Sequence, residues 1–296
     1  MSAGERAVGI RVDLKLPPQH VAWPVLRDAS LEADRADAFT SLWFFDHLHS
    51  VSSGPNPSPE PGPCFEGWSI LAGLATVTDK IRLGLMVSAV PYRHPGVLAN
   101  IVATIDVMSG GRVDLGLGAG NNLEEVTAYG INMGPPGERI AALDEACTVL
   151  RALLGPDDVV SFAGAHFSLE GARCLPKPVQ TRVPFFIGGK GERKTLPLVA
   201  RHGDGWNYSN GTPEEFAAKL AVLRASCEAF GREPGAVMPS VQVRALPGEL
   251  HTVAANAQGY IAAGARHIIL YTPADPASVE PLARIADELR AHGAAL

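Results

Sequence analysis

The sequence predicts a (β/α)8 barrel, an α/β fold in which eight parallel strands alternate with helices. Short apolar runs rich in β-branched residues alternate with stretches whose apolar residues recur at helical spacing. Eight such units fit into 296 residues, a length within the range of this barrel. A doubly wound open sheet is the competing architecture, because short strands are difficult to count from a single sequence.

Each expected strand has a short apolar core and is followed by a stretch at helical spacing. The strands are expected at residues 7–14, 41–45, 81–87, 113–117, 184–189, 205–208, 237–245 and 267–271. The main helices are expected at residues 21–38, 66–77, 96–107, 139–154, 192–202, 213–230, 252–263 and 277–292. Thr212 is the predicted N-cap of the helix at 213–230, because a hydroxyl side chain there can accept a free backbone N–H.

The stretch from residue 81 to 122 shows most clearly how ligand-binding positions follow from this pattern. Two apolar strands, 81–87 and 113–117, are joined by a helical stretch of the length that a parallel crossover needs. In barrels and open α/β sheets, ligands bind at the carboxyl ends of the strands. We therefore expect residues 86–91 and 118–122, which follow the two strands, to line one pocket.

The chain is expected to form one domain over residues 1–296, because no linker divides it. The Pro/Gly/Ser-rich stretch near 48–65 and the region near 155–180 are interpreted as insertions. The second should contain a small hairpin, because residues 159–169 alternate loosely around Gly164. A long loop inside a compact domain, as at 48–65, is usually functional.

Composition narrows the classes of partner. The net charge is −6 and no Lys/Arg stripe is present, which argues against nucleic acid. No apolar run reaches the roughly 18 residues of a membrane span, and the N-terminus lacks a signal-peptide core. The four cysteines are widely spaced and fit no zinc or redox pattern. We expect a cytoplasmic protein with reduced thiols that acts on a small molecule.

Asp46, His47 and His49 follow the second strand directly. An acid next to a histidine can be a structural hydrogen bond. A His-x-His pair at a strand end can also bind a metal, but the other strand ends offer mainly Gly, Asn and Tyr. The third interpretation is acid–base chemistry, because histidine titrates near neutral pH.

Two glycine clusters also follow strands. The run from Gly116 to Gly120 does not match the dinucleotide fingerprint, because its third glycine would fall at Asn121. It is either a tight turn or a backbone that must approach a flat ring closely. The cluster from Gly188 to Gly191 precedes a predicted helix, with Lys190 and Arg193 beside it. Glycine amides at a helix N-terminus favour an anion, such as a phosphate.

Several motifs together resemble the luciferase-like monooxygenase family, most closely its coenzyme F420-dependent oxidoreductase branch. The resemblance runs from about residue 8 to 207 and weakens afterwards. In chain order, its motifs are Phe65-Glu-x-Trp68, Ile81-Arg-Leu-Gly84, Tyr92-Arg-His-Pro95, Asp106-x-x-Ser-Gly-Gly-Arg112, Gly116-x-Gly-Ala-Gly120, Leu175-Pro-Lys-Pro178, Ile187-Gly-Gly189 and Asp204-Gly-Trp-Asn207.

The resemblance implies a barrel with insertions, often dimeric, that binds a flavin or deazaflavin at the strand ends and transfers a hydride at the central ring. It implies that His47 is the acid–base or substrate-orienting residue and that Asp46 meets the pyrimidine side of the ring. It also implies a non-proline cis peptide at Met86-Val87 that supports the ring. The remaining cofactor-binding positions implied are Ser88, Ala119, Gly120, Gly188, Gly189, Gly191 and Glu192.

The sequence departs from the family pattern at Asn121. Several relatives carry Trp or a carboxylate at this catalytic position, and an asparagine cannot deliver a proton as an acid. The proton would then come from His47, the nearby Glu124 or water. The basic residues that clamp a phosphorylated substrate cannot be matched in the last third of the chain, so a sugar phosphate is not predicted.

The first functional hypothesis is therefore an F420-dependent oxidoreductase that forms a homodimer and acts on a small organic substrate. An FMN-dependent monooxygenase using reduced flavin and O2 is the nearest alternative, because both cofactors share a ribityl phosphate scaffold. A non-catalytic flavin-binding protein and a metal-dependent hydrolase are the remaining hypotheses.

Overall fold

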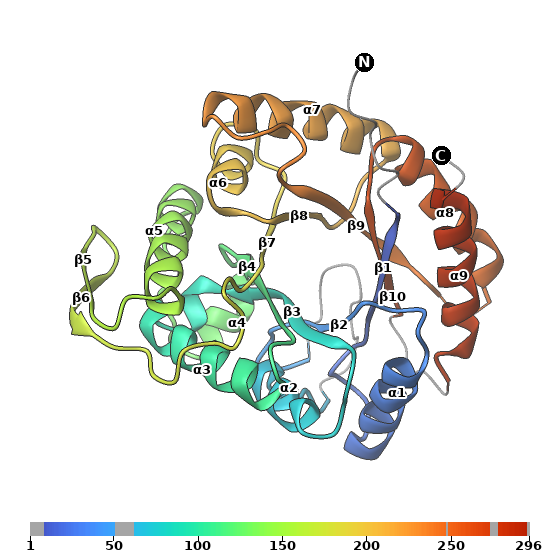
Figure 1. Ribbon diagram of the computed structural model, residues 1–296, viewed down its shortest axis with the longest axis horizontal. Coiled ribbons are helices and arrows are strands. Elements are labelled where there is room, and N and C mark those ends of the chain that lie inside the picture. The colour runs from blue at the N-terminus through green and yellow to red at the C-terminus, as the bar shows by residue number, and fades with distance from the viewer. Residues whose placement is uncertain (1–8, 51–61, 247, 273–277, 295–296) are drawn as a thin grey trace.

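The computed structural model describes residues 9–50, 62–246, 248–272 and 278–294. Within them, eight parallel strands close into a barrel in the order β1-β10-β9-β8-β7-β4-β3-β2, with helices around its outside (Figure 1). The predicted (β/α)8 barrel is confirmed, and the doubly wound sheet is excluded by the closure of β1 on both β2 and β10.

All eight barrel strands lie within two residues of the predicted bounds wherever the structure describes them. The predicted start of the first strand, residues 7–8, lies outside the described residues. The barrel strands are β1 (Arg11–Lys15), β2 (Ser41–Phe44), β3 (Arg82–Ala89), β4 (Val113–Gly118), β7 (Phe185–Gly188), β8 (Gly205–Tyr208), β9 (Met238–Arg244) and β10 (His267–Tyr271).

The helices also follow the predicted order. They are α1 (Trp23–Arg35), α2 (Gly67–Ala75), α3 (Pro95–Met108), α4 (Leu123–Ala128), α5 (Pro136–Leu154), α6 (Thr195–His202), α7 (Pro213–Ala229), α8 (Leu250–Ala262) and α9 (Glu280–Ala294). Thr212 caps α7 by accepting a hydrogen bond from the Glu215 amide, as predicted. The prediction for α6 was three residues too long at its start, because residues 189–194 form a non-helical turn. No helix among the described residues is long and apolar enough to cross a membrane.

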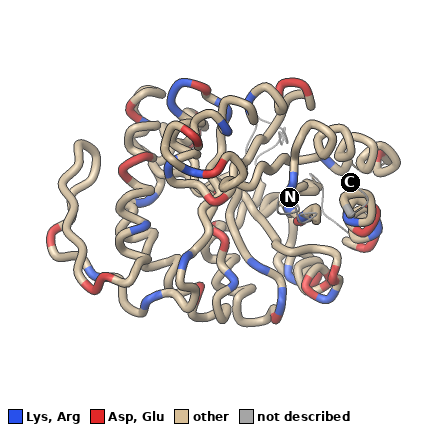
Figure 2. Tube along the Cα trace, turned by 45° about the horizontal axis from the view of Figure 1, so that its top comes forward, with Lys and Arg blue, Asp and Glu red and all other residues tan. Residues whose placement is uncertain are grey.

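The predicted hairpin is confirmed as β5 (Val160–Ala163) paired antiparallel with β6 (Ser168–Ala172). It lies outside the barrel beside α5 (Figure 1). Most of the 48–65 insertion falls at residues 51–61, outside the described residues. Charged residues of both signs are interspersed along the helices and loops (Figure 2).

The barrel interior is stacked in layers, because alternate residues of each strand point inward. The amino-end layer is polar and contains buried ionisable groups from β1, β4 and β10. The middle layer is apolar and packs Trp43 against Phe186, with ring centroids 5.2 Å apart, together with Met86 and Ile269. The carboxyl-end layer is polar again and contains Lys15 and Gln242.

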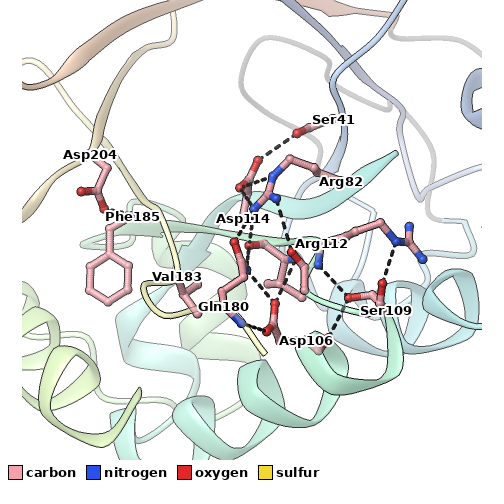
Figure 3. A network of polar contacts seen from close by, with 12 residues as sticks. Ser41, Arg82, Asp106, Ser109, Arg112, Asp114, Gln180, Val183, Phe185 and Asp204 are labelled. Carbon is pink, nitrogen blue, oxygen red and sulfur yellow. Dashed lines mark hydrogen bonds and ion pairs between the residues drawn. The ribbon is translucent and has the colours of Figure 1, made fainter. Parts of the chain in front are cut away.

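Arg82, Asp106 and Arg112, which belong to the motifs quoted above, form much of the polar structure around the amino end of the barrel (Figure 3). Arg82 binds Asp114 through Nε at 2.8 Å and also reaches Gln180. Gln180 in turn donates to Asp106 at 2.7 Å. Arg112 donates to the backbone carbonyls of the turn before β3, including that of residue 78 at 2.6 Å. These charged residues therefore join strands and helices, and they lie at the opposite end of the barrel from the predicted site.

Candidate active site

Asp46 lies two residues after the end of β2 and is buried, with 3% of its surface exposed. Its carboxylate accepts hydrogen bonds from Arg93 at 2.6 and 3.0 Å and from Ser88 Oγ at 2.8 Å. Ser88 accepts from Trp68 Nε1 at 3.1 Å, and Arg93 also binds Glu66 at 2.5 Å. The Asp46 side chain is thus hydrogen-bonded to other side chains inside the protein. The prediction that Asp46 contacts the cofactor ring did not include these partners.

His47 is held by a second buried carboxylate, that of Glu125 in α4. Nδ1 of His47 lies 2.8 Å from Glu125 Oε2, and Glu125 also accepts from Tyr92 Oη and from the Leu48 amide. Burial is the largest influence on Glu125 and works toward a higher pKa. The hydrogen bonds from His47, Tyr92 and Leu48 outweigh it and lower the pKa of Glu125 to about 2. Glu125 is therefore ionised at neutral pH.

An ionised Glu125 determines how His47 can act. The carboxylate can only accept, so Nδ1 of His47 must carry the proton that is shared with it. In the neutral imidazole the lone pair is then on Nε2, which makes no hydrogen bond with any described residue. The His47 side chain is 25% exposed. His47 can accordingly take a proton at Nε2, and Glu125 stabilises the resulting imidazolium.

The peptide bond between Met86 and Val87 is cis, as the family resemblance implied. Val87 is half-buried and lies against Gly118 of β4 and Gly188 of β7. A Cβ on Gly118 would come within 2.4 Å of the Val87 side chain. The glycine at 118 therefore makes room for Val87, which is a more specific reason than close approach to a ring.

Ala119 and Gly120 are half-buried after β4, and Asn121 is exposed. Gly120 has a φ of +77°, a conformation that favours glycine, and its carbonyl accepts from Arg139 at 2.7 Å. The turn is thus fixed by its backbone. Asn121 makes no hydrogen bond within the described part of the chain, and no observation gives it a role in proton transfer.

The loop after β7 leaves backbone donors free. The N–H groups of residues 190–195 donate no hydrogen bond to a described residue, and α6 has no side-chain N-cap. Gly189 has a φ of +128°, and a Cβ on Gly191 would meet the Thr195 hydroxyl at 2.9 Å. Free amides at a glycine-rich helix start fit an anionic group such as a phosphate.

The charged side chains of this loop differ in availability. Glu192 binds Lys219 at 2.6 Å and is exposed, so its side chain is engaged in a surface pair. Lys190 lies 3.8 Å from Glu215 and 5.5 Å from the Tyr208 ring centroid. Arg193 is exposed and pairs with no described residue. The loop therefore combines free amides with an available cation.

The histidine pair does not form a metal site in the described structure. His49 Nδ1 contacts the Ser50 carbonyl at 2.9 Å, and its ring stacks on Tyr129. Among the residues that the structure describes, no three His, Cys, Asp or Glu side chains are grouped so that they could hold a metal.

Sequence reasoning missed the residues that support Asp46 and His47. Glu125, and not the exposed Glu124, contacts His47. Tyr92 and Arg93 appeared only as parts of a motif, although each binds one of the two carboxylates. An acidic residue in the first turn of a helix that follows a barrel strand was the available signal for Glu125.

The closed barrel brings these strand ends to one mouth, and together they define an enzyme of the (β/α)8 barrel class. A family model described as luciferase-like monooxygenase matches residues 14–294. The chain belongs to this family.

Curated relatives include F420-dependent dehydrogenases. The F420-dependent glucose-6-phosphate dehydrogenase of Microbacterium testaceum is 34% identical over 188 residues, covering 62% of this chain and 52% of that protein. The F420-dependent hydroxymycolic acid dehydrogenase of Mycobacterium tuberculosis is 29% identical over 222 residues, covering 75% of this chain and 59% of that protein. The alignments thus span little more than half the length of these two relatives.

Solved structures share the fold. An F420-dependent secondary alcohol dehydrogenase with an F420-acetone adduct superposes with a TM-score of 0.81 at 17% identity, covering 94% of this chain and 98% of that one. An EDTA monooxygenase from Chelativorans superposes with a TM-score of 0.80 at 14% identity, covering 97% and 95%. At these identities the likeness concerns the fold alone.

Proposed function

We propose that the protein is an F420-dependent oxidoreductase that transfers a hydride between the deazaflavin and an alcohol or its ketone. The names of both curated relatives support the cofactor, and the name of the hydroxymycolic acid dehydrogenase supports an alcohol as the substrate class. The observation that carries the proposal is the His47–Glu125 pair, in which a buried carboxylate leaves Nε2 of a mouth histidine available as a base.

The residues present fit the cofactor. The free amides at 190–195, with Gly188, Gly189 and Gly191, would hold its phosphate, and Arg193 would add charge. Met86, Val87 and Ser88 would line the ring together with Ala119 and Gly120. When bound, the deazaflavin supplies the carbon that accepts or donates the hydride.

His47 handles the proton in this proposal. When the alcohol is oxidised, Nε2 takes the hydroxyl proton, and Glu125 stabilises the imidazolium that forms. In the reverse direction the imidazolium returns the proton to the carbonyl oxygen. Asp46 has a supporting role, because its pair with Arg93 fixes the chain next to His47.

Titration of the protein with F420 and with FMN, followed by fluorescence, tests the cofactor. We expect F420 to bind at micromolar concentration and FMN not to bind. The reverse result would favour the monooxygenase reaction with reduced flavin and O2.

Replacement of His47 by Ala tests the proton transfer. Single-turnover hydride transfer to F420 should slow by about 100-fold, the usual contribution of a general base. His49→Ala is the matched control, because His49 is two residues away and contacts Ser50 instead. Equal rates in His47→Ala and the wild type would remove the base from the mechanism.

We also propose a homodimer, as the family resemblance implies. Apolar side chains of α3 remain exposed in the single chain, including Val97 at 56% and Met108 at 42%. Light scattering of the purified protein would measure the mass directly, and a monomer would contradict this proposal.

A further inference from the structure

Lys15 is the last residue of β1 and lies inside the barrel at its carboxyl end. Arg11, Asp13 and Lys15 alternate with apolar residues of the outer core, so all three point inward. Only 6% of the Lys15 surface is exposed. Its position is in the polar layer at the mouth, next to the apolar middle layer.

The ammonium group of Lys15 is held by neutral partners. Nζ donates to Gln242 Oε1 at 2.9 Å and lies 4.5 Å from the ring centroid of Tyr271. Gln242 is oriented by its own donation to Asn207 at 2.8 Å. Asn207 donates to Ser240 at 3.4 Å. This chain of amides turns one carbonyl oxygen toward Lys15 and fixes where the amine points.

The charge of Lys15 has no negative partner in the described structure. Arg11, on the same strand and face, is paired with Asp13 and Asp114 at 2.9 and 2.8 Å. Lys15 forms no such pair with a described carboxylate, and Gln242 satisfies only one of its three donors. Burial accordingly lowers the pKa of Lys15 to about 7.

A buried cation with unused donors costs stability unless it is compensated. If Lys15 only made a structural hydrogen bond to Gln242, a neutral side chain could replace it. An oxygen that carries negative charge would supply both the missing acceptor and the missing countercharge. The reaction proposed above produces such an oxygen, because a substrate alcohol passes through alkoxide character when its hydride leaves.

We propose that Lys15 is the oxyanion-binding residue of this active site and that its ammonium group contacts the substrate oxygen during hydride transfer. This inference rests on the proposed function. In alcohol oxidation the C–H bond breaks with its electron pair going to the oxidised cofactor. The O–H proton goes to His47, and the C=O bond forms. Lys15 gains and loses no atom, and it stabilises the charge that develops on the oxygen.

The first test uses the protein without cofactor. Acetate serves as the oxyanion probe, and its effect is measured as the rise in Tm in the wild type, in Lys15→Met and in Lys80→Met. Lys80 is the control because it is 61% exposed and pairs with Asp37 at the surface. We expect acetate to raise the Tm of the wild type and of Lys80→Met but not of Lys15→Met.

The same experiment separates a functional from a structural lysine. Without acetate, Lys15→Met should have a Tm equal to or higher than that of the wild type, because it removes an uncompensated buried charge. A clear fall in Tm, an acetate effect that persists in Lys15→Met, or no acetate effect in the wild type would each overturn the inference.

The second test measures F420 binding and hydride transfer with 2-propanol, acetone and longer secondary alcohols. F420 affinity should be unchanged in Lys15→Met, while kcat/KM falls by about 100-fold and Lys15→Arg recovers part of it. A wild type that does not bind F420 would refute the proposed function. If the wild type reduces F420 with an alcohol no faster than Lys15→Met does, the role of Lys15 is refuted.

Discussion

Replacing Glu125 by Gln should change how the stability of the protein depends on pH. The pKa of Glu125 falls from its ordinary value of 4.5 to about 2 in the folded protein. This difference corresponds to about 3 kcal/mol of stability. Because the folded pKa is the lower one, this stability is present above pH 4.5 and is lost as the pH falls toward 2. About 2 kcal/mol of it should be lost between pH 6 and pH 3.

Urea unfolding at several pH values between 6 and 3 measures the effect. The wild type should lose about 2 kcal/mol more over this range than Glu125→Gln, which cannot ionise. At pH 7 the variant should be less stable, because an amide cannot accept all the hydrogen bonds that the carboxylate accepts. Glu124→Gln is the control, since Glu124 is the exposed neighbour. Parallel pH profiles for the wild type and Glu125→Gln would refute this reasoning.

Three further outcomes are expected in urea unfolding. Gly116→Ala should lower the free energy of unfolding by about 3 kcal/mol, because the added Cβ would lie 2.0 Å from a backbone carbonyl oxygen. Gly235→Ala is the control and should leave the free energy of unfolding nearly unchanged, because a Cβ there meets no atom within 4 Å. Arg93→Met should cost about 3–5 kcal/mol, because it leaves the Asp46 carboxylate buried without its partner. Burial lowers the pKa of His267, so wild-type stability should decline as pH falls below 6.5, and His267→Gln should weaken that decline.

The fold could be predicted because its signals are local. Most barrel strands contain a short apolar run, and glycine or polar residues follow closely in sequence. The prediction failed where the backbone does not follow the helical preference of its residues. The helix predicted to start at residue 192 begins only at Thr195, although the residues before it are able to form a helix. There, glycine conformations and tertiary contacts determine where the helix begins.

The candidate site was only partly predictable. Asp46 and His47 are adjacent and follow a strand, so the sequence could indicate them. Their partners could not be indicated in the same way, because His47 and Glu125 are 78 residues apart and Asp46 and Arg93 are 47 apart. Lys15 was missed for a related reason: its proposed role depends on the lack of a carboxylate partner among the described residues, which is a property of the assembled barrel.

The apolar middle layer of the barrel separates two charged regions along its axis. Trp43 and Phe186 form its aromatic part, and both side chains are buried. The layer therefore separates the ion pairs at one end of the barrel from the proposed site at the other. Because an apolar layer screens charge less than water does, a change in charge among the ion pairs at the amino end should be felt at the carboxyl end of the barrel.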